Sequence, residues 1–151
     1  MIFKKAVLFF CFLVLWSAGC GAQQLKGTSF NSEHYQVFTD HDDQAFAKNI
    51  GLEAERCHRT LSEYFAATGK ASSCRIQIAT EYKHYKALRK KEISAGEFHA
   101  GFMITPTIIV SWRSTMRGRE ILSHEMVHFF VEEYMPEIAD WKNEGLALAL
   151  E

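Results

Sequence analysis

Residues 123–128 read Ser-His-Glu-Met-Val-His, and the rest of the chain is interpreted around this stretch because it contains the pattern H-E-x-x-H. Residues four apart lie on one face of an α-helix, so His124 and His128 can direct two imidazoles at one metal ion. Glu125 is turned about 100° from His124, close enough to reach a metal-bound water without binding the metal itself. The pattern therefore predicts a helix that carries two metal ligands and a general base.

A third ligand is expected from residues 141–147, which read WKNEGLA. Glu144 follows His128 by sixteen residues, which leaves room for the first helix to end, turn and return. Two neutral imidazoles and one carboxylate would give a Zn²⁺ site a net charge of about +1 and leave a fourth position for water. The alternative is a chance pattern on a surface helix. The apolar periodicity around the motif favours a packed helix instead, with a face formed by Ile121, Leu122, Val127, Phe129 and Phe130.

Together, the two stretches resemble the gluzincin metallopeptidases, and most of all the small bacterial peptidase MA-like domains. Those domains pair H-E-x-x-H with a downstream W-x-x-E-G-x-A helix. The resemblance covers roughly residues 33–151, and its specific part lies in residues 97–151. It implies a zinc-dependent peptidase that acts on a peptide or protein substrate, with Glu125 as the general base. By the same likeness His124, His128 and Glu144 are the zinc ligands.

The chain departs from related patterns at two points. A metzincin would carry Gly and His where this chain has Val131 and Tyr134, so that branch is a poor match. Gluzincin relatives usually place a Tyr or His beyond the third ligand to stabilise the oxyanion, and the sequence ends at Glu151. The donor would then come from upstream, with Tyr134, His99 and Tyr85 as candidates, or the domain is truncated at its C-terminus. The alternative functions are a catalytically weak or inactive zincin-like lipoprotein that binds a partner in the envelope, and a zinc hydrolase acting on other bonds.

The first nineteen residues are expected to be a targeting segment. Two lysines precede an apolar run of eleven residues, 6–16, which is shorter than the roughly 20 that a membrane-spanning helix needs. Residues 17–20 resemble the lipobox of bacterial lipoproteins, which would make Cys20 the acylated first residue of the mature protein. An ordinary secretory signal cut near Ala18 or Ala22 is the alternative.

This reading places the protein in the bacterial cell envelope. A lipid on Cys20 would hold it at the outer membrane or the periplasmic face, and without the lipid it would be secreted or periplasmic. Residues 20–32 would then form a polar tether to one domain, 33–151. The net charge of −1 and the lack of a basic run give no indication of nucleic-acid binding.

Cys57 and Cys74 remain after Cys11 is removed with the signal and Cys20 is modified. In an oxidising compartment an even pair is a candidate disulfide, and closing a loop of about 17 residues would stabilise the fold by roughly 3 kcal/mol. The alternative is two buried free thiols.

Periodicity predicts an α+β fold, and the resemblance implies that it is of the small zincin-like type. In it, a mixed sheet of about three to four strands packs on the zinc-ligand helix and on a long N-terminal helix. The first expected element is a strand over 34–39, followed by a helix from Asp40 or Asp42 to about Ala67. Next come a strand over 74–79 and a basic helix over 81–91. A strand over 107–111, the zinc helix over 118–134 and a final helix from about Asp140 follow.

Some expectations concern single positions in these elements. Leu52 and Tyr64 belong to the apolar stripe of the long N-terminal helix. In the basic helix Tyr82 points inward, and the Lys and Arg residues, Arg89 among them, form a solvated face.

The stretch 96–103 is punctuated by glycines, and the strand over 107–111 is either a sheet edge that could align a substrate or a buried strand. Asn143 either orients Glu144 or the substrate or is a plain polar helix residue, and Gly145 permits close helix packing.

Overall fold

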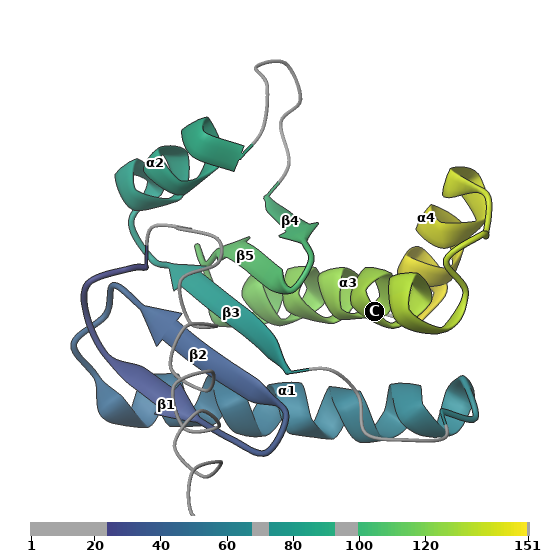
Figure 1. Ribbon diagram of the computed structural model, residues 1–151. Helices are drawn as coiled ribbons and strands as arrows, with labels where there is room; N and C mark the ends of the chain where they lie inside the picture. The colour runs from purple at the N-terminus through teal and green to yellow at the C-terminus, as the bar shows by residue number, and fades with distance from the viewer. Residues whose placement is uncertain (1–23, 68–72, 93–99, 151) are drawn as a thin grey trace, which may run out of the picture.

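A mixed sheet of five strands forms the centre of the fold in the computed structural model, which describes residues 24–67, 73–92 and 100–150. Its strands follow the order β1-β2-β3-β5-β4, and the three inner ones run parallel while β1 and β4 are antiparallel to their neighbours (Figure 1). The strands are β1 (Ser29–Asn31), β2 (Tyr35–Thr39), β3 (Cys74–Ala79), β4 (Gly101–Ile104) and β5 (Thr107–Ser111). The predicted α+β class is confirmed, and the expected three to four strands become five.

The two outer strands are the ones that the sequence analysis missed. β1 has three residues and β4 has four, too few for an alternating pattern to stand out. β1 also lies within the stretch 20–32 that was expected to be a tether. Just before it, the backbone N–H of Leu25 donates to Gln77 Oε1 at 3.2 Å, so the packed structure begins ahead of residue 33.

Two long helices cover one face of the sheet. α1 (Gln44–Tyr64) packs on β1 and β2, α3 (Thr115–Tyr134) packs on β4 and β5, and the two helices contact each other (Figure 1). Alternate strand residues point into this layer because successive side chains of a strand face opposite ways. The main core therefore joins sheet and helices, with Val37, Ile76, Ile78, Ile108, Val110, Leu122, Met126, Val127 and Phe130 among its buried members.

A smaller core lies on the opposite face, under α2 (Tyr82–Glu92). Tyr85 and Leu88 of that helix pack with Ile109 and Phe102. The sequence predicted that Tyr82 also points inward, but its side chain is 45% exposed. Helix α2 is thus held by one narrow apolar stripe.

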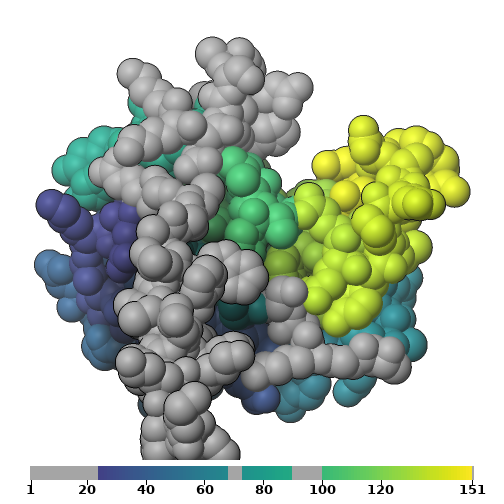
Figure 2. All heavy atoms as spheres, in the orientation of Figure 1, coloured from purple at the N-terminus to yellow at the C-terminus, as the bar shows by residue number. Residues whose placement is uncertain are grey.

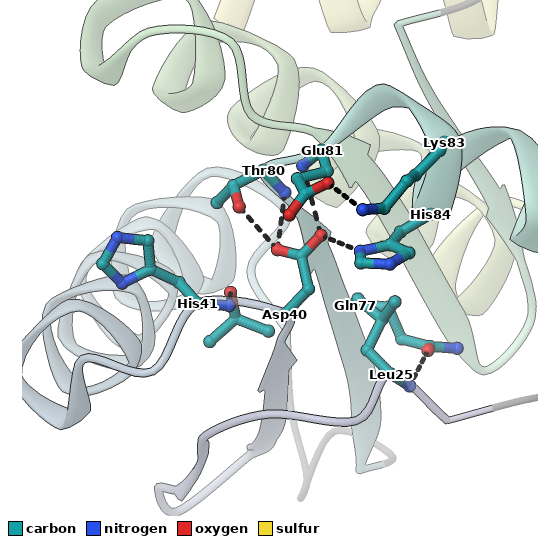
Figure 3. Close-up of polar contacts among 9 residues, drawn as sticks. Leu25, Asp40, His41, Gln77, Thr80, Glu81, Lys83 and His84 are labelled. Atoms are coloured by element: carbon teal, nitrogen blue, oxygen red, sulfur yellow. Dashed lines mark hydrogen bonds and ion pairs between the residues drawn. The ribbon is translucent and has the colours of Figure 1, made fainter.

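Asp40 fixes the start of α2, although the sequence analysis considered it as a cap for α1. Its Oδ1 accepts from the Thr80 backbone N–H at 2.8 Å and from the Thr80 hydroxyl at 2.6 Å, and its Oδ2 accepts from the Glu81 N–H at 3.1 Å (Figure 3). The same Oδ2 lies 2.7 Å from His84 Nδ1. Burial would raise the pKa of Asp40, but the hydrogen bonds from Thr80, His84 and Glu81 outweigh it and lower the pKa.

Helix α1 is capped by Asp43, whose side chain accepts from the Ala45 N–H. Two positions expected in its apolar stripe, Leu52 and Tyr64, are exposed. His58 is buried in their place, because Tyr35 supplies a hydroxyl 2.8 Å from His58 Nδ1. A satisfied histidine thus replaces an aliphatic residue in the α1 layer.

The strand that precedes α3 was considered either as a sheet edge or as a buried strand, and the structure shows the second. β5 lies between β3 and β4, and all five of its residues are buried. The edge is β4, which continues into β5 through a cis Thr105–Pro106 peptide bond.

Both remaining cysteines are free thiols, so the expected Cys57–Cys74 bridge is not formed. Burial raises the pKa of Cys57 to about 11 and that of Cys74 to about 12. Thiols in such surroundings act as small apolar core residues. The predicted signal segment 1–19 and the lipidation site Cys20 lie outside the described residues. Within the described ranges, no helix is both long and apolar enough to cross a membrane.

Candidate metal centre

Helix α3 begins earlier than the sequence predicted, at Thr115 instead of Gly118. Ser114 is its N-cap, and its hydroxyl accepts from the Arg117 N–H at 3.4 Å. The helix buries residues on most of its circumference because the sheet, α1 and α4 (Asp140–Leu150) all contact it. His124 and His128 lie on the side that meets α4, where both are half-buried.

The three expected ligands come together at the contact between α3 and α4. The Nε2 atoms of His124 and His128 are 3.1 Å apart. Each also lies 3.5 Å from a Glu144 carboxylate oxygen, His124 from Oε2 and His128 from Oε1. A tetrahedral zinc with bonds of about 2.0–2.2 Å separates its donor atoms by about 3.3–3.6 Å. The two nitrogen–oxygen distances lie in this range, although they go to different oxygens of Glu144, and the nitrogen–nitrogen distance is slightly shorter. One donor atom from each residue lies within 4.8 Å of the others, so the group could hold one metal ion, and two imidazoles with one carboxylate are donors that suit zinc.

Asn143 orients one of these imidazoles. Its Oδ1 lies 2.8 Å from His128 Nδ1, so the ring donates its Nδ1–H to the amide and keeps the Nε2 lone pair for a metal. Such hydrogen bonds fix the tautomer and the ring angle of metal-binding histidines. The sequence analysis left Asn143 open between orienting Glu144 or the substrate and being a plain polar helix residue; the structure shows its contact with His128 instead.

Glu125 is placed beside the ligands but faces away from solvent, with 7% of its surface exposed. Burial, together with the nearby Glu144 carboxylate, raises the pKa of Glu125 to about 8. A divalent cation between the three ligands would oppose the second cause and favour the ionised carboxylate. The ionisation of the Glu125 carboxylate would therefore depend on whether a cation lies between His124, His128 and Glu144.

Gly101, the first residue of edge strand β4, lets the sheet approach Glu125 closely. A methyl group at this position would lie 2.8 Å from Glu125 Oε1 and 2.5 Å from Ile121 Cγ2. Those distances are shorter than van der Waals contact. The missing side chain therefore makes the space that the Glu125 carboxylate occupies, a role that the sequence analysis did not assign. The nearest sequence indication was the Gly-punctuated stretch 96–103.

The two described candidates for an upstream oxyanion donor, Tyr134 and Tyr85, lie in different parts of the structure. Tyr134 stacks on Phe130 with ring centroids 5.7 Å apart and belongs to the main core. Tyr85 is buried on the α2 face, near enough to Glu125 for that carboxylate to contribute to raising its pKa. His99 lies outside the described residues.

Helix α4 presents Glu144 with little packing of its own. Gly145 was expected to permit close helix packing, but a methyl group there would meet no atom within 4 Å. Trp141 is 73% exposed and Ala147 is the helix's one fully buried residue. The β4 segment in green and the α3–α4 end of the chain in yellow-green and yellow are exposed on the same face of the molecule (Figure 2).

Comparisons with protein-family models, with curated proteins and with solved structures found no match to this chain.

Proposed function

We propose that this chain is a zinc-dependent peptidase of the gluzincin type with a zincin-like fold. The observation that carries the proposal is the donor triangle of His124, His128 and Glu144, in which one donor atom from each residue lies within 4.8 Å of the others and each imidazole Nε2 is 3.5 Å from a Glu144 oxygen. Two neighbours support a catalytic use of that ion. Asn143 fixes the tautomer of His128, and the buried Glu125 carboxylate lies next to the triangle.

Zinc bound here would supply Lewis-acid polarisation of a carbonyl and would acidify a bound water. The residues of the chain perform the remaining tasks. Glu125 accepts the proton of the attacking water and returns it to the leaving amine, which its position beside the ligands and its raised pKa suit. Asn143 keeps the His128 ring in place while the charge at the site changes.

Strand β4 is the element that would align a peptide substrate. It is the edge of the sheet, and its first residue contacts Glu125 through the space left by the Gly101 side chain. An extended peptide can add to such an edge by main-chain hydrogen bonds. A peptide aligned in this way would place its scissile bond beside the Glu125 carboxylate.

The test uses the soluble protein that starts after Cys20. We expect about one zinc per chain, and Glu144→Ala should weaken zinc binding because one of three ligands is lost. Glu125→Gln should keep the zinc and abolish cleavage of a denatured protein substrate, while Glu120→Gln, on the exposed side of the same helix, should keep both. Wild-type cleavage by Glu125→Gln, or cleavage that survives a chelator, would overturn the assignment.

We further propose that the protein is a lipoprotein of the bacterial cell envelope, anchored through Cys20. Labelled fatty acid should be incorporated in cells expressing the wild type and lost in Cys20→Ser. Equal labelling of both proteins would contradict the anchor.

A further inference from the structure

A pocket of about 200 Å³ lies where α2, β5 and the start of α3 meet. This volume is below the roughly 300–1,000 Å³ of pockets that hold whole small molecules. It suits a single side chain or the end of a chain. The residues of its lining that matter here are Arg89, Arg113, Arg117, Tyr82, Tyr85 and Ile121.

The pocket carries a concentrated positive charge. Three of its lining residues are arginines, and none of the described lining residues is an aspartate or glutamate. The guanidinium of Arg113 lies over the Tyr82 ring, 5.3 Å from its centroid, which holds the charge at the opening. Guanidinium groups bind planar carboxylates through paired hydrogen bonds, so this lining selects for an anionic group.

The pocket lies close to the proposed catalytic base on α3. Ile121 lines it, and one helical turn further along α3 is Glu125; both side chains lie against Gly101. Ala100, the residue before β4, also lines the pocket. Burial raises the pKa of Tyr85 to about 12, and the nearby Glu125 carboxylate adds to the rise. Arg89 and Arg113 oppose it, so Tyr85 lies within electrostatic range of both the pocket arginines and Glu125.

We propose that this pocket binds a carboxylate of the peptide substrate on the C-terminal side of the bond that is cut. The proposal rests on the peptidase function above. Its direction follows from the sheet, because a peptide added antiparallel to β4 would have its C-terminal end at the start of that strand, beside Ala100. The carboxylate can come from the C-terminus of a short peptide or from an Asp or Glu side chain.

Peptide binding separates these two sources. Zinc-loaded Glu125→Gln protein is titrated into fluorescein-labelled peptides of one sequence, and anisotropy is measured. The peptides have a free C-terminus, an amidated C-terminus, or an amidated C-terminus with Glu or Gln at one internal position. Either carboxylate should tighten binding about tenfold over its neutral counterpart, and the peptide that does so identifies the source.

Arginine variants assign the effect to the pocket. Arg113→Gln together with Arg117→Gln, both exposed at the opening, should remove the preference for a carboxylate. Arg59→Gln removes the same charge from an exposed position on α1 and should leave the preference intact. Equal affinity for all four peptides, or a preference unchanged in the double variant, would overturn the proposal.

Three further outcomes are informative. If the double variant loses binding to anionic phosphatidylglycerol vesicles while the peptide preference persists, the arginines contact lipid headgroups and the proposal is wrong. If zinc binding or cleavage fails but the carboxylate preference is present and depends on the arginines, the peptidase proposal falls and the pocket stands. Cleavage without any carboxylate preference would refute the pocket alone.

Discussion

Gly101→Ala tests the contact between edge strand β4 and Glu125. The added methyl carbon would lie 2.5 Å from Ile121 Cγ2 and 3.0 Å from Glu125 Cγ. Carbon atoms in contact are about 3.5 Å or more apart, so Ile121 must separate from the strand by about 1 Å and Glu125 by about 0.5 Å. Overpacking of this size costs about 1–3 kcal/mol of unfolding free energy. None of the three metal ligands is touched directly.

We therefore expect Gly101→Ala to lower stability and turnover but to leave zinc affinity nearly unchanged. Gly101→Ala should lower the free energy of unfolding by about 1–3 kcal/mol in urea titrations. It should lower kcat/KM roughly 10²-fold, because a misplacement of the base by less than about 1 Å disturbs proton transfer. Zinc affinity, measured by competition with a chromophoric chelator, should change by less than about threefold, since the ligands on α3 and α4 stay in place.

Gly145→Ala is the matched control for this experiment. It makes the same chemical change beside Glu144, but the added methyl would meet no atom within 4 Å. In a helix interior the exchange should stabilise the protein by up to about 1 kcal/mol. Wild-type stability and turnover in Gly101→Ala would refute the reasoning. The stability measurement tests the contact even if no substrate is found.

Three other changes test separate contacts. Asn143→Ala should weaken zinc binding about tenfold in the chelator competition, because His128 Nδ1 loses an acceptor 2.8 Å away; unchanged affinity would contradict the orienting role. Asp40→Asn should lower the free energy of unfolding by about 1–2 kcal/mol near pH 7. Because the pKa of Asp40 is lowered in the folded protein, its contribution is present above pH 4–5 and is lost as the pH falls further, so the difference between variant and wild type should shrink in acid; a constant difference would count against it. Tyr35→Phe removes the hydroxyl 2.8 Å from His58 Nδ1 and should cost about 1–2 kcal/mol in urea titrations with no change in zinc affinity.

The sequence located the elements that follow a long or regular pattern. The α+β class, the two long helices, and strands β2, β3 and β5 were all predicted, because each has enough residues to show its periodicity. The convergence of His124, His128 and Glu144 was predicted as well. The i, i+4 spacing fixes two of these residues on one helix face, and the loop length allows the third to return.

What the sequence could not supply depends on contacts between distant segments. Whether β5 is an edge or an inner strand is decided by β4, a four-residue strand without a clear pattern. Gly101 gives no indication of its neighbour Glu125, since an absent side chain leaves no chemical pattern to read. The arginine pocket escaped notice because Arg89 was read as part of a solvated helix face. Its partners Arg113 and Arg117 lie on segments that only the fold brings together.

The weak packing of α4 has a consequence for how the protein would respond to metal. This helix brings the third ligand, yet it fully buries only Ala147 and leaves Trp141 and Leu148 exposed. A zinc ion shared between α3 and α4 would act as a cross-link, and its binding energy would be linked to the docking of the helix. Amide hydrogen exchange in residues 140–150 should therefore slow as free zinc rises, while exchange in the central strands stays the same. In that case the zinc concentration around the protein would determine how well α4, which carries Glu144, is ordered.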